Sequence, residues 1–176
     1  MALILSCRDF TPQFGHDCFL AENATVIGDV IMGDQCSVWF QAVVRGDVHF
    51  IRIGNKVNIQ DGAILHGTFQ KCGTTIGNNV SIGHRALVHG CTLHDNVLVG
   101  MGAIIMDQAV VEENCLIAAG ALILEKTVCH AGGVYAGVPA RRVKELSPEL
   151  FEGEIQRIAQ NYTMYAGWFK QNPDAR

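Results

Sequence analysis

The chain has 176 residues, of which 49% are hydrophobic but only 7% aromatic, and 19 are glycine. The net charge is −4, and the 13 Lys and Arg residues are scattered along the chain, which excludes a basic stripe for nucleic acid. No apolar run approaches the ~20 residues of a membrane span, and the N-terminus lacks a signal-peptide pattern. We therefore expect one domain with a core of small and aliphatic residues, and neither nucleic acid nor membrane as a partner.

An aliphatic or aromatic residue recurs every six positions through most of the chain. The series runs from Phe14 to Val44, from Ile53 to Leu65 and, with one step of five, from Ile76 to Ile123. The next position is often glycine, and the fourth position after is small or β-branched. A period of six fits neither a helix nor a flat strand, and hexapeptide repeats are a signature of β-solenoids. The eighteen hexads predict an all-β solenoid, a left-handed parallel β-helix of about six triangular coils.

The remaining sequence divides around this repeat. We expect residues 1–13 to be an N-terminal lead-in, 14–127 the β-helix, 128–146 a connecting segment and 147–170 a C-terminal α-helix. Ser147-Pro148-Glu149 reads as an N-cap, a proline in the first turn and an acidic residue near the helix start. Apolar residues follow at helical spacing, so this helix should lie along a face of the prism or across a subunit boundary.

The seven cysteines show no paired spacing. Cys36, Cys91 and Cys115 fall where the repeat requires a small buried residue. We interpret them as reduced core residues, which predicts a cytoplasmic protein.

Three hexads make one coil, so hexads three apart share a face of the prism. Arg45, His66 and His89 each take the second position of hexads that share one face. They should form an outward column, with the two histidines one strand spacing apart, which suits two imidazoles on one metal ion.

Asp61 and His84 take the third position of their hexads on the preceding face and should also stack. One chain would therefore need distortion to close all three histidines around an ion. A neighbouring chain could present its His84 to the pair instead, and threefold symmetry would then give three equivalent sites. Two structural alternatives stay open: Arg45 and Asp47 as a plain interface salt bridge, and Gln60 and Asp61 as turn caps.

Several motifs together resemble the γ-class carbonic anhydrases and their anhydrase-like hexapeptide relatives. They are Arg45-Gly46-Asp47, Asn58-Ile59-Gln60-Asp61-Gly62, Leu65-His66, Gly83-His84-Arg85, Val88-His89-Gly90, Val99-Gly100-Met101-Gly102 and Ala136-Gly137-Val138-Pro139-Ala140. The likeness covers nearly the whole chain, and the ordered set is specific to the family, although the last motif alone also occurs in hexapeptide acyltransferases.

The resemblance implies a homotrimer that binds zinc, or alternatively iron or cobalt, through His66 and His89 of one subunit and His84 of the next. It implies reversible hydration of carbon dioxide to bicarbonate by metal-bound hydroxide. By the same likeness, Gln60 orients the hydroxide and Asn58 helps to position the substrate. Arg45, Asp47 and Asp61 belong to the interface network, and Tyr162 of the C-terminal helix lines the site.

The chain also departs from the family pattern. Val48 stands where the archetype has an acidic residue, and the segment Gly67 to Cys72 lacks the glutamate that exports protons. The expected activity is therefore low or served by another proton shuttle. Two alternatives remain open: a hexapeptide-repeat acyl-CoA thioesterase or acyltransferase, and a non-catalytic anhydrase-like assembly protein.

Overall fold

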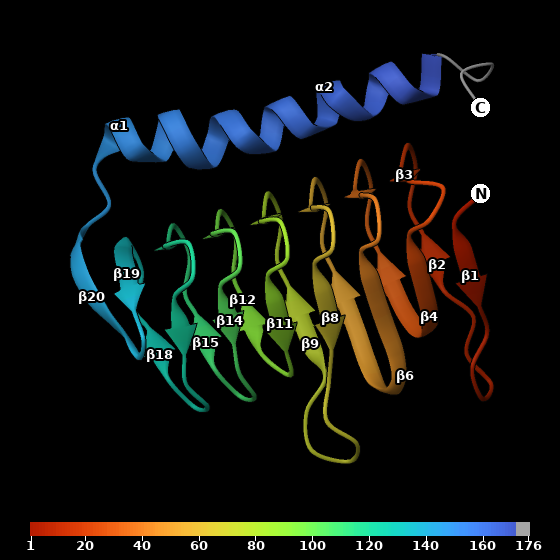
Figure 1. The fold of residues 1–176 in the computed structure, drawn as a ribbon, viewed down its shortest axis with the longest axis horizontal. Coiled ribbons are helices and arrows are strands. Elements are labelled where there is room, and N and C mark those ends of the chain that lie inside the picture. The colour runs from red at the N-terminus through yellow and green to blue at the C-terminus, as the bar shows by residue number, and fades with distance from the viewer. Residues whose placement is uncertain (172–176) are drawn as a thin grey trace.

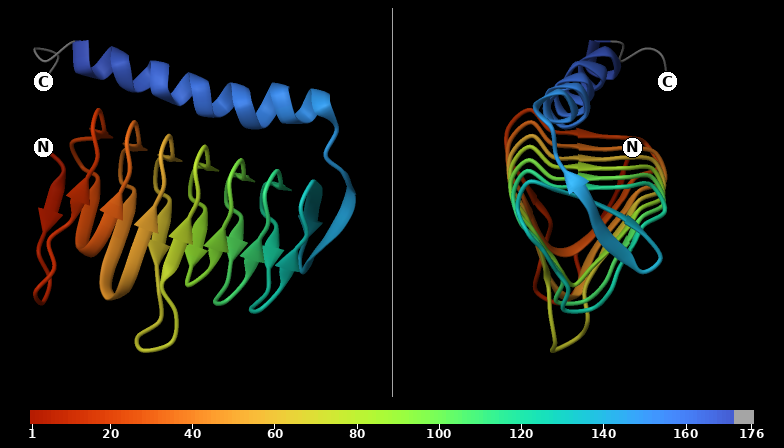
Figure 2. Two further views of the ribbon diagram at one scale, coloured as in Figure 1. Left: turned by 180° about the vertical axis from the view of Figure 1, so that it is seen from behind. Right: turned by 90° about the vertical axis from the view of Figure 1, so that its left-hand side faces the viewer.

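A computed structural model describes residues 1–171 of the chain. The chain winds into a parallel β-helix of triangular cross-section, and a single helical rod lies along one side of the stack (Figures 1 and 2). The predicted fold class is confirmed. Within residues 1–171, no helix is both long and apolar enough to cross a membrane.

One face of the prism lies under the helical rod, and we call it the helix face (Figure 2). Its parallel strands are β3 (Phe19–Leu20), β5 (Ser37–Val38), β7 (Asn58–Ile59), β10 (Ser81–Ile82), β13 (Leu98–Val99), β16 (Leu116–Ile117) and β19 (Gly133–Gly137). An antiparallel strand, β20 (Ala140–Glu145), closes this sheet at its C-terminal end.

The second face carries His66 and His89 and is called the histidine face below. Its strands are β1 (Leu3–Leu5), β8 (Ile64–His66), β11 (Leu87–His89), β14 (Ile104–Ile105) and β17 (Leu122–Ile123). The third face contains β2 (Gln13–Phe14), β9 (Thr74–Ile76), β12 (Thr92–Leu93), β15 (Val110–Val111) and β18 (Val128–Cys129). Two long strands, β4 (Thr25–Met32) and β6 (Val43–Ile53), run through both faces.

The core is one column of aliphatic side chains inside the prism. The first residue of each hexad points inward, and Val44, Leu65 and Val88 are all fully buried. Alanines such as Ala63 fill the tight corners and are equally buried. Glycine at the next position reflects close contact between coils, because a Cβ on Gly54 would lie 2.7 Å from the backbone of the coil above. The six-residue pattern is thus a direct record of which atoms face inward.

The stack continues beyond residue 127, into the segment expected to be a connection. Cys129 and Tyr135 pair in register with Val111 and Ile117 of the preceding coil. They occupy the inward position that is aliphatic elsewhere, and both are buried. This extra winding gives about seven turns where the repeat predicted about six. At the other end of the stack, β1 lies within the predicted lead-in and pairs with β4 of the first coil.

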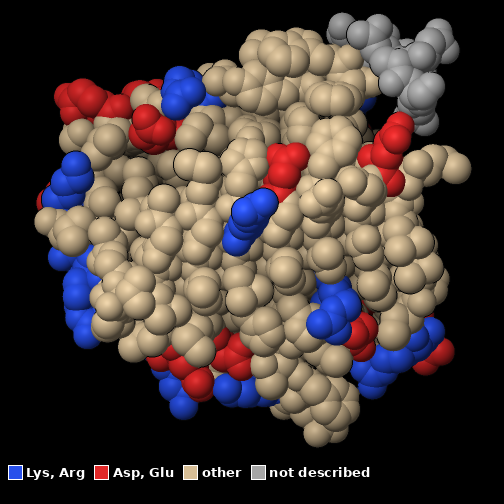
Figure 3. Space-filling view, in the orientation of Figure 1, with Lys and Arg blue, Asp and Glu red and all other residues tan. Residues whose placement is uncertain are grey.

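The helical rod consists of α1 (Pro148–Leu150), a π-helical segment η1 (Phe151–Gln156) and α2 (Arg157–Gln171). The predicted cap is confirmed, because the Ser147 hydroxyl accepts a hydrogen bond from the Leu150 backbone at 3.3 Å. Figure 3 shows that charged side chains gather mainly along the lower edge and the ends of the visible face. Much of that face is therefore uncharged.

Candidate functional site

His66 and His89 stand side by side at the ends of β8 and β11. Their backbones are directly paired in the parallel ladder, so both side chains point outward from the histidine face. Nδ1 of His66 lies 3.2 Å from Nε2 of His89, and the ring centroids are 5.2 Å apart. This is the stacking that the six-residue repeat predicted.

Each of these histidines also contacts a carboxylate through its other ring nitrogen. Nε2 of His66 lies 3.0 Å from Oδ1 of Asp47, and Nδ1 of His89 lies 2.6 Å from Oδ1 of Asp107. Burial lowers the pKa of His66, and Arg45 adds to this effect, while the Asp47 hydrogen bond opposes it. The net result favours a neutral imidazole, the form that binds metal ions.

Asp47 is itself held in place by Arg45, whose Nη1 lies 2.6 Å from Oδ2 of the carboxylate. Partial burial would raise the pKa of Asp47, but hydrogen bonds from Arg45 and His66 outweigh burial and lower it. Arg45 and Asp47 therefore form an ion pair within the chain, and that pair supports His66.

Asp107 is fixed more extensively than Asp47. Its Oδ2 accepts hydrogen bonds from Thr68 Oγ1 at 2.7 Å and from Lys71 Nζ at 3.1 Å, and Lys71 also contacts Glu125 at 3.0 Å. Burial opposes ionisation, but the bonds from Thr68, His89 and Lys71 dominate and hold the pKa of Asp107 well below its usual range. Asp107 is therefore a fixed carboxylate at neutral pH.

Three further residues of the site, Asp107, Thr68 and Lys71, were not predicted from the sequence. Asp107 is the third residue of the hexad that begins at Ile105, one coil after His89 on the same face. The repeat therefore contained the signal for Asp107, diagonal to the histidine. Thr68 and Lys71 lie in the excursion between β8 and β9, where no period exists to place them.

His84 lies on the turn after β10, beside the helix face and apart from the histidine pair. Its Nδ1 is 2.9 Å from Oδ2 of Asp61, and its Nε2 is 3.4 Å from the hydroxyl of Tyr162 on α2. Burial, together with the charge of Asp61 and the neighbouring Tyr165, raises the pKa of Tyr162 to about 12. Tyr162 therefore keeps its proton at neutral pH and can donate it to Nε2.

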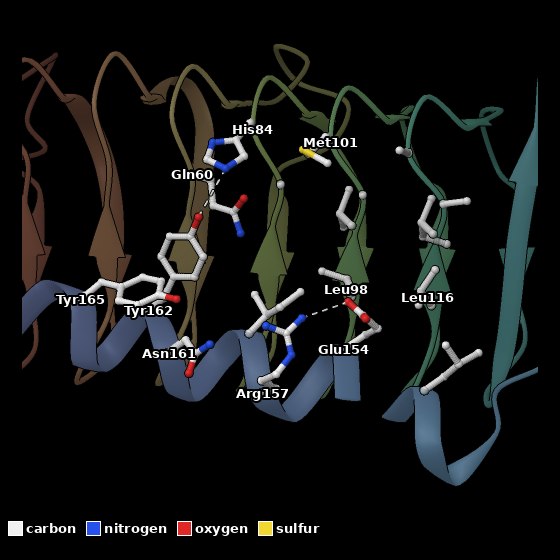
Figure 4. Close-up of a pocket in the computed structure, with 18 residues that line it drawn as sticks. Gln60, His84, Leu98, Met101, Leu116, Glu154, Arg157, Asn161, Tyr162 and Tyr165 are labelled. Atoms are coloured by element: carbon white, nitrogen blue, oxygen red, sulfur yellow. Dashed lines mark hydrogen bonds and ion pairs between the residues drawn. The ribbon is translucent and has the colours of Figure 1, made fainter. Parts of the chain in front are cut away.

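Gln60 and Asn58 form a buried polar row next to His84. Nε2 of Gln60 donates to Oδ1 of Asn58 at 3.0 Å, and Nδ2 of Asn58 donates to Oγ of Ser81 at 2.7 Å. All three side chains are nearly inaccessible to solvent. The row fixes the Gln60 amide at the edge of a cavity that also contains His84 and Tyr162 (Figure 4).

The predicted ligands therefore fall into two groups on different faces. Among residues 1–171 there is no cluster of three or more His, Cys, Asp or Glu side chains arranged to hold a metal ion within one chain. A shared site would need His66 and His89 from one subunit and His84 from another.

The donor chemistry of the three histidines fits a metal ion. Two imidazoles on a tetrahedral ion with bonds of ~2.0–2.1 Å have nitrogens about 3.3 Å apart, close to the 3.2 Å between His66 and His89. Each histidine, His84 included, contacts an aspartate through one ring nitrogen. Carboxylates in this position fix the tautomer and orientation of metal-binding histidines.

Comparison with known proteins places the chain among hexapeptide-repeat proteins. Residues 90–125 match the family model described as bacterial transferase hexapeptide (six repeats). The carbonic anhydrase of Geobacillus kaustophilus is 39% identical over 168 residues, which cover 96% of this chain and 91% of that protein. The mitochondrial γ carbonic anhydrase 1 of Arabidopsis thaliana is 39% identical over 93% of this chain, which spans only 60% of the plant protein.

A solved structure extends the similarity to three dimensions. A Bacillus cereus protein named as a candidate acetyltransferase superposes with a TM-score of 0.93 at 32% identity, over 97% of this chain and 98% of that one. Sequence and fold therefore agree on a family whose members carry names of two different activities.

Proposed function

Because this chain belongs to the γ carbonic anhydrase family of hexapeptide-repeat proteins, we propose that it catalyses the reversible hydration of carbon dioxide to bicarbonate. The catalytic ion would be zinc, or alternatively Fe²⁺ or Co²⁺, bound by His66 and His89 of one subunit and His84 of the next. The observation that carries the proposal is the histidine pair, with facing nitrogens 3.2 Å apart and a carboxylate behind each ring.

When bound, the ion supplies Lewis-acid chemistry that makes water nucleophilic near neutral pH. The protein supplies the orientation of the ligands. Asp47 and Asp107 hold the two imidazoles of the histidine face, and Asp61 holds His84. Each carboxylate selects one tautomer, so the opposite ring nitrogen keeps its lone pair.

Gln60 and Tyr162 are the residues we assign to the reacting molecules. Gln60 is held by Asn58 in a buried row, and Tyr162 stays protonated beside His84. An amide and a phenol can both donate hydrogen bonds to oxygen atoms of carbon dioxide or bicarbonate and orient them. Asn58 acts indirectly, because it holds the Gln60 side chain in place.

A homotrimer is the assembly we propose, and the histidine face supports it. Outward-facing Ile64, Leu87, Ile104 and Leu122 stack in register on successive coils of that face. Ile64 is 43% exposed and Ile104 is 39% exposed in the single chain. A continuous aliphatic column on a solvent-facing sheet is suited to burial against another subunit. A second copy of this chain would cover the column and bring its own His84 toward His66 and His89.

Metal analysis of the purified full-length chain, combined with a carbon dioxide hydration assay, tests the proposal. We expect about one divalent ion per chain, from three shared sites per trimer, and measurable hydration. His89→Ala should lose the metal and the activity, whereas His94→Ala, a histidine on the third face, should keep both. A wild-type protein that binds no divalent ion would contradict the proposal.

A further inference from the structure

A cavity of about 530 Å³ lies between the helical rod and the helix face (Figure 4). One end is polar and contains Gln60, His84 and Tyr162. From there the cavity extends toward Leu150, with Leu98, Leu116 and Ile158 among its walls. The volume falls within the range of small-molecule sites, ~300–1,000 Å³, and exceeds what triatomic carbon dioxide needs.

The cavity exists because side-chain size changes along the helix face. Toward the N-terminal coils, Trp39 packs against Tyr162 and Phe169, with ring centroids 5.2 and 5.6 Å apart, and fills the space below α2. Toward the C-terminal coils, the equivalent outward positions are Gly83, Gly100 and Ala118, which leave that space open.

The helical rod is irregular at the same place. Its π-helical segment, Phe151–Gln156, contributes Glu154 to the cavity lining. Single π-helical turns are rare and are frequently found at functional sites. An irregular helix above a row of minimal side chains indicates a cavity that is built into the fold.

The polarity of the walls defines the ligand. The outward row beside the cavity changes from Asn58 and Ser81 at the polar end to Leu98 and Leu116 farther along. Arg157 lines the distal part, and its Nη2 lies 3.4 Å from Glu154, which balances its charge. The distal region therefore favours hydrocarbon over a second anionic group.

We propose that this cavity binds a linear aliphatic monocarboxylate, with the carboxylate beside Gln60, His84 and Tyr162 and the chain between Leu98, Leu116 and Ile158. The position of the carboxylate rests on the proposed function. Bicarbonate is a carboxylate group that bears a hydroxyl, and an alkyl chain in place of that hydroxyl would extend into the apolar part of the cavity. Such a ligand would share the carboxylate group of bicarbonate and would also bury its hydrocarbon chain.

Calorimetric titration of the full-length, metal-loaded protein with acetate, butyrate, hexanoate and octanoate tests the assignment. Burial of each methylene should tighten the dissociation constant about two- to fourfold until the chain exceeds the cavity. Ala118→Leu should fill the cavity and flatten this dependence. Ala119→Phe provides a second filled variant at a more exposed lining position. Ala136→Leu, in the column of Ala118 but one coil farther on, lies outside the lining and should keep the wild-type dependence.

Equal dissociation constants across the series in the wild-type protein would overturn the assignment. An unchanged chain-length dependence in both filled variants would also overturn it. These failures are distinct from failure of the proposed function, because metal content and carbon dioxide hydration are measured separately on the same preparation. A protein that binds metal and hydrates carbon dioxide but ignores chain length would refute the cavity assignment alone.

Discussion

Asp107 accepts a hydrogen bond of 2.6 Å from Nδ1 of His89, across one coil boundary of the β-helix. The carboxylate is locked on its other oxygen by Thr68 and Lys71. His89 therefore cannot rotate freely, and its Nε2 is directed toward His66. A ligand with a fixed orientation loses less entropy when it binds a metal ion.

Removal of this carboxylate should weaken metal binding. We expect Asp107→Ala to lower zinc affinity about 10- to 100-fold, as measured by competition with a chromophoric chelator. Asp107→Asn should lose less, because its amide oxygen can still accept a hydrogen bond from Nδ1. Glu113→Gln, an exposed acid on the third face, is the matched control and should bind as the wild type does. Wild-type affinity in Asp107→Ala would show that His89 needs no such support.

The stacking of His66 on His89 followed from the sequence because the hexad period assigns a face to each outward position. The same period also predicted that Asp61 and His84 stack beside each other on the preceding face, which is the helix face. It could not place Thr68 and Lys71, because they lie between β8 and β9 in a segment without the repeat. Asp107 was missed for a different reason: it contacts His89 diagonally, so it lies in the column beside the one that the histidines occupy.

The position where the β-helix ends and the cavity under the helical rod could not be predicted from the six-residue pattern, and each has a physical reason. Cys129 and Tyr135 fill inward positions with a thiol and a phenol ring, so the aliphatic signal ends before the coils do. The cavity depends on the distance between helix and sheet, which Trp39 and Phe169 help to set by their bulk. The change from large to small side chains between distant coils does not repeat every six residues, so the period cannot predict it.

The aliphatic column on the histidine face predicts how the oligomer can be disrupted. Ile104→Lys should weaken subunit association at least about tenfold, because a lysine there would be buried without a partner. Sedimentation velocity or light scattering should then show loss of the trimer. Val128→Lys is the matched control, since Val128 is exposed to a similar extent, 45% against 39%, but lies on the third face. A stable trimer in Ile104→Lys would place the interface on another surface.

Cys18 and Cys36 occupy the same corner of successive coils and should differ in reactivity. The neighbouring Cys36 thiol, opposed by burial and aided by Lys170, lowers the pKa of Cys18 to about 6. The Cys18 thiol and burial raise the pKa of Cys36. A lowered thiol pKa means that thiolate accumulates as the pH rises through about 6, so alkylation of Cys18 should rise steeply between about pH 5 and 7.

Mass spectrometry after brief iodoacetamide treatment would measure that profile residue by residue. Cys36 should stay unlabelled over the same range. In Cys18→Ser, the labelling that rises between about pH 5 and 7 should disappear. A midpoint for Cys18 above about pH 8 would contradict the lowered pKa of its thiol.

Subunit mixing tests whether the histidines act across an interface. His84→Ala chains keep His66 and His89, and His89→Ala chains keep His84, so each variant alone should lack a complete site. When the two are denatured together and refolded at equal amounts, about a quarter of the interfaces should combine intact halves in a randomly assembled trimer. Carbon dioxide hydration and bound zinc should recover to about that fraction of the wild type. A mixture of His66→Ala and His89→Ala chains is the matched control and should recover nothing, because both changes damage the same half. Recovery in neither mixture, from chains that refold into trimers, would show that the three histidines do not form a shared site.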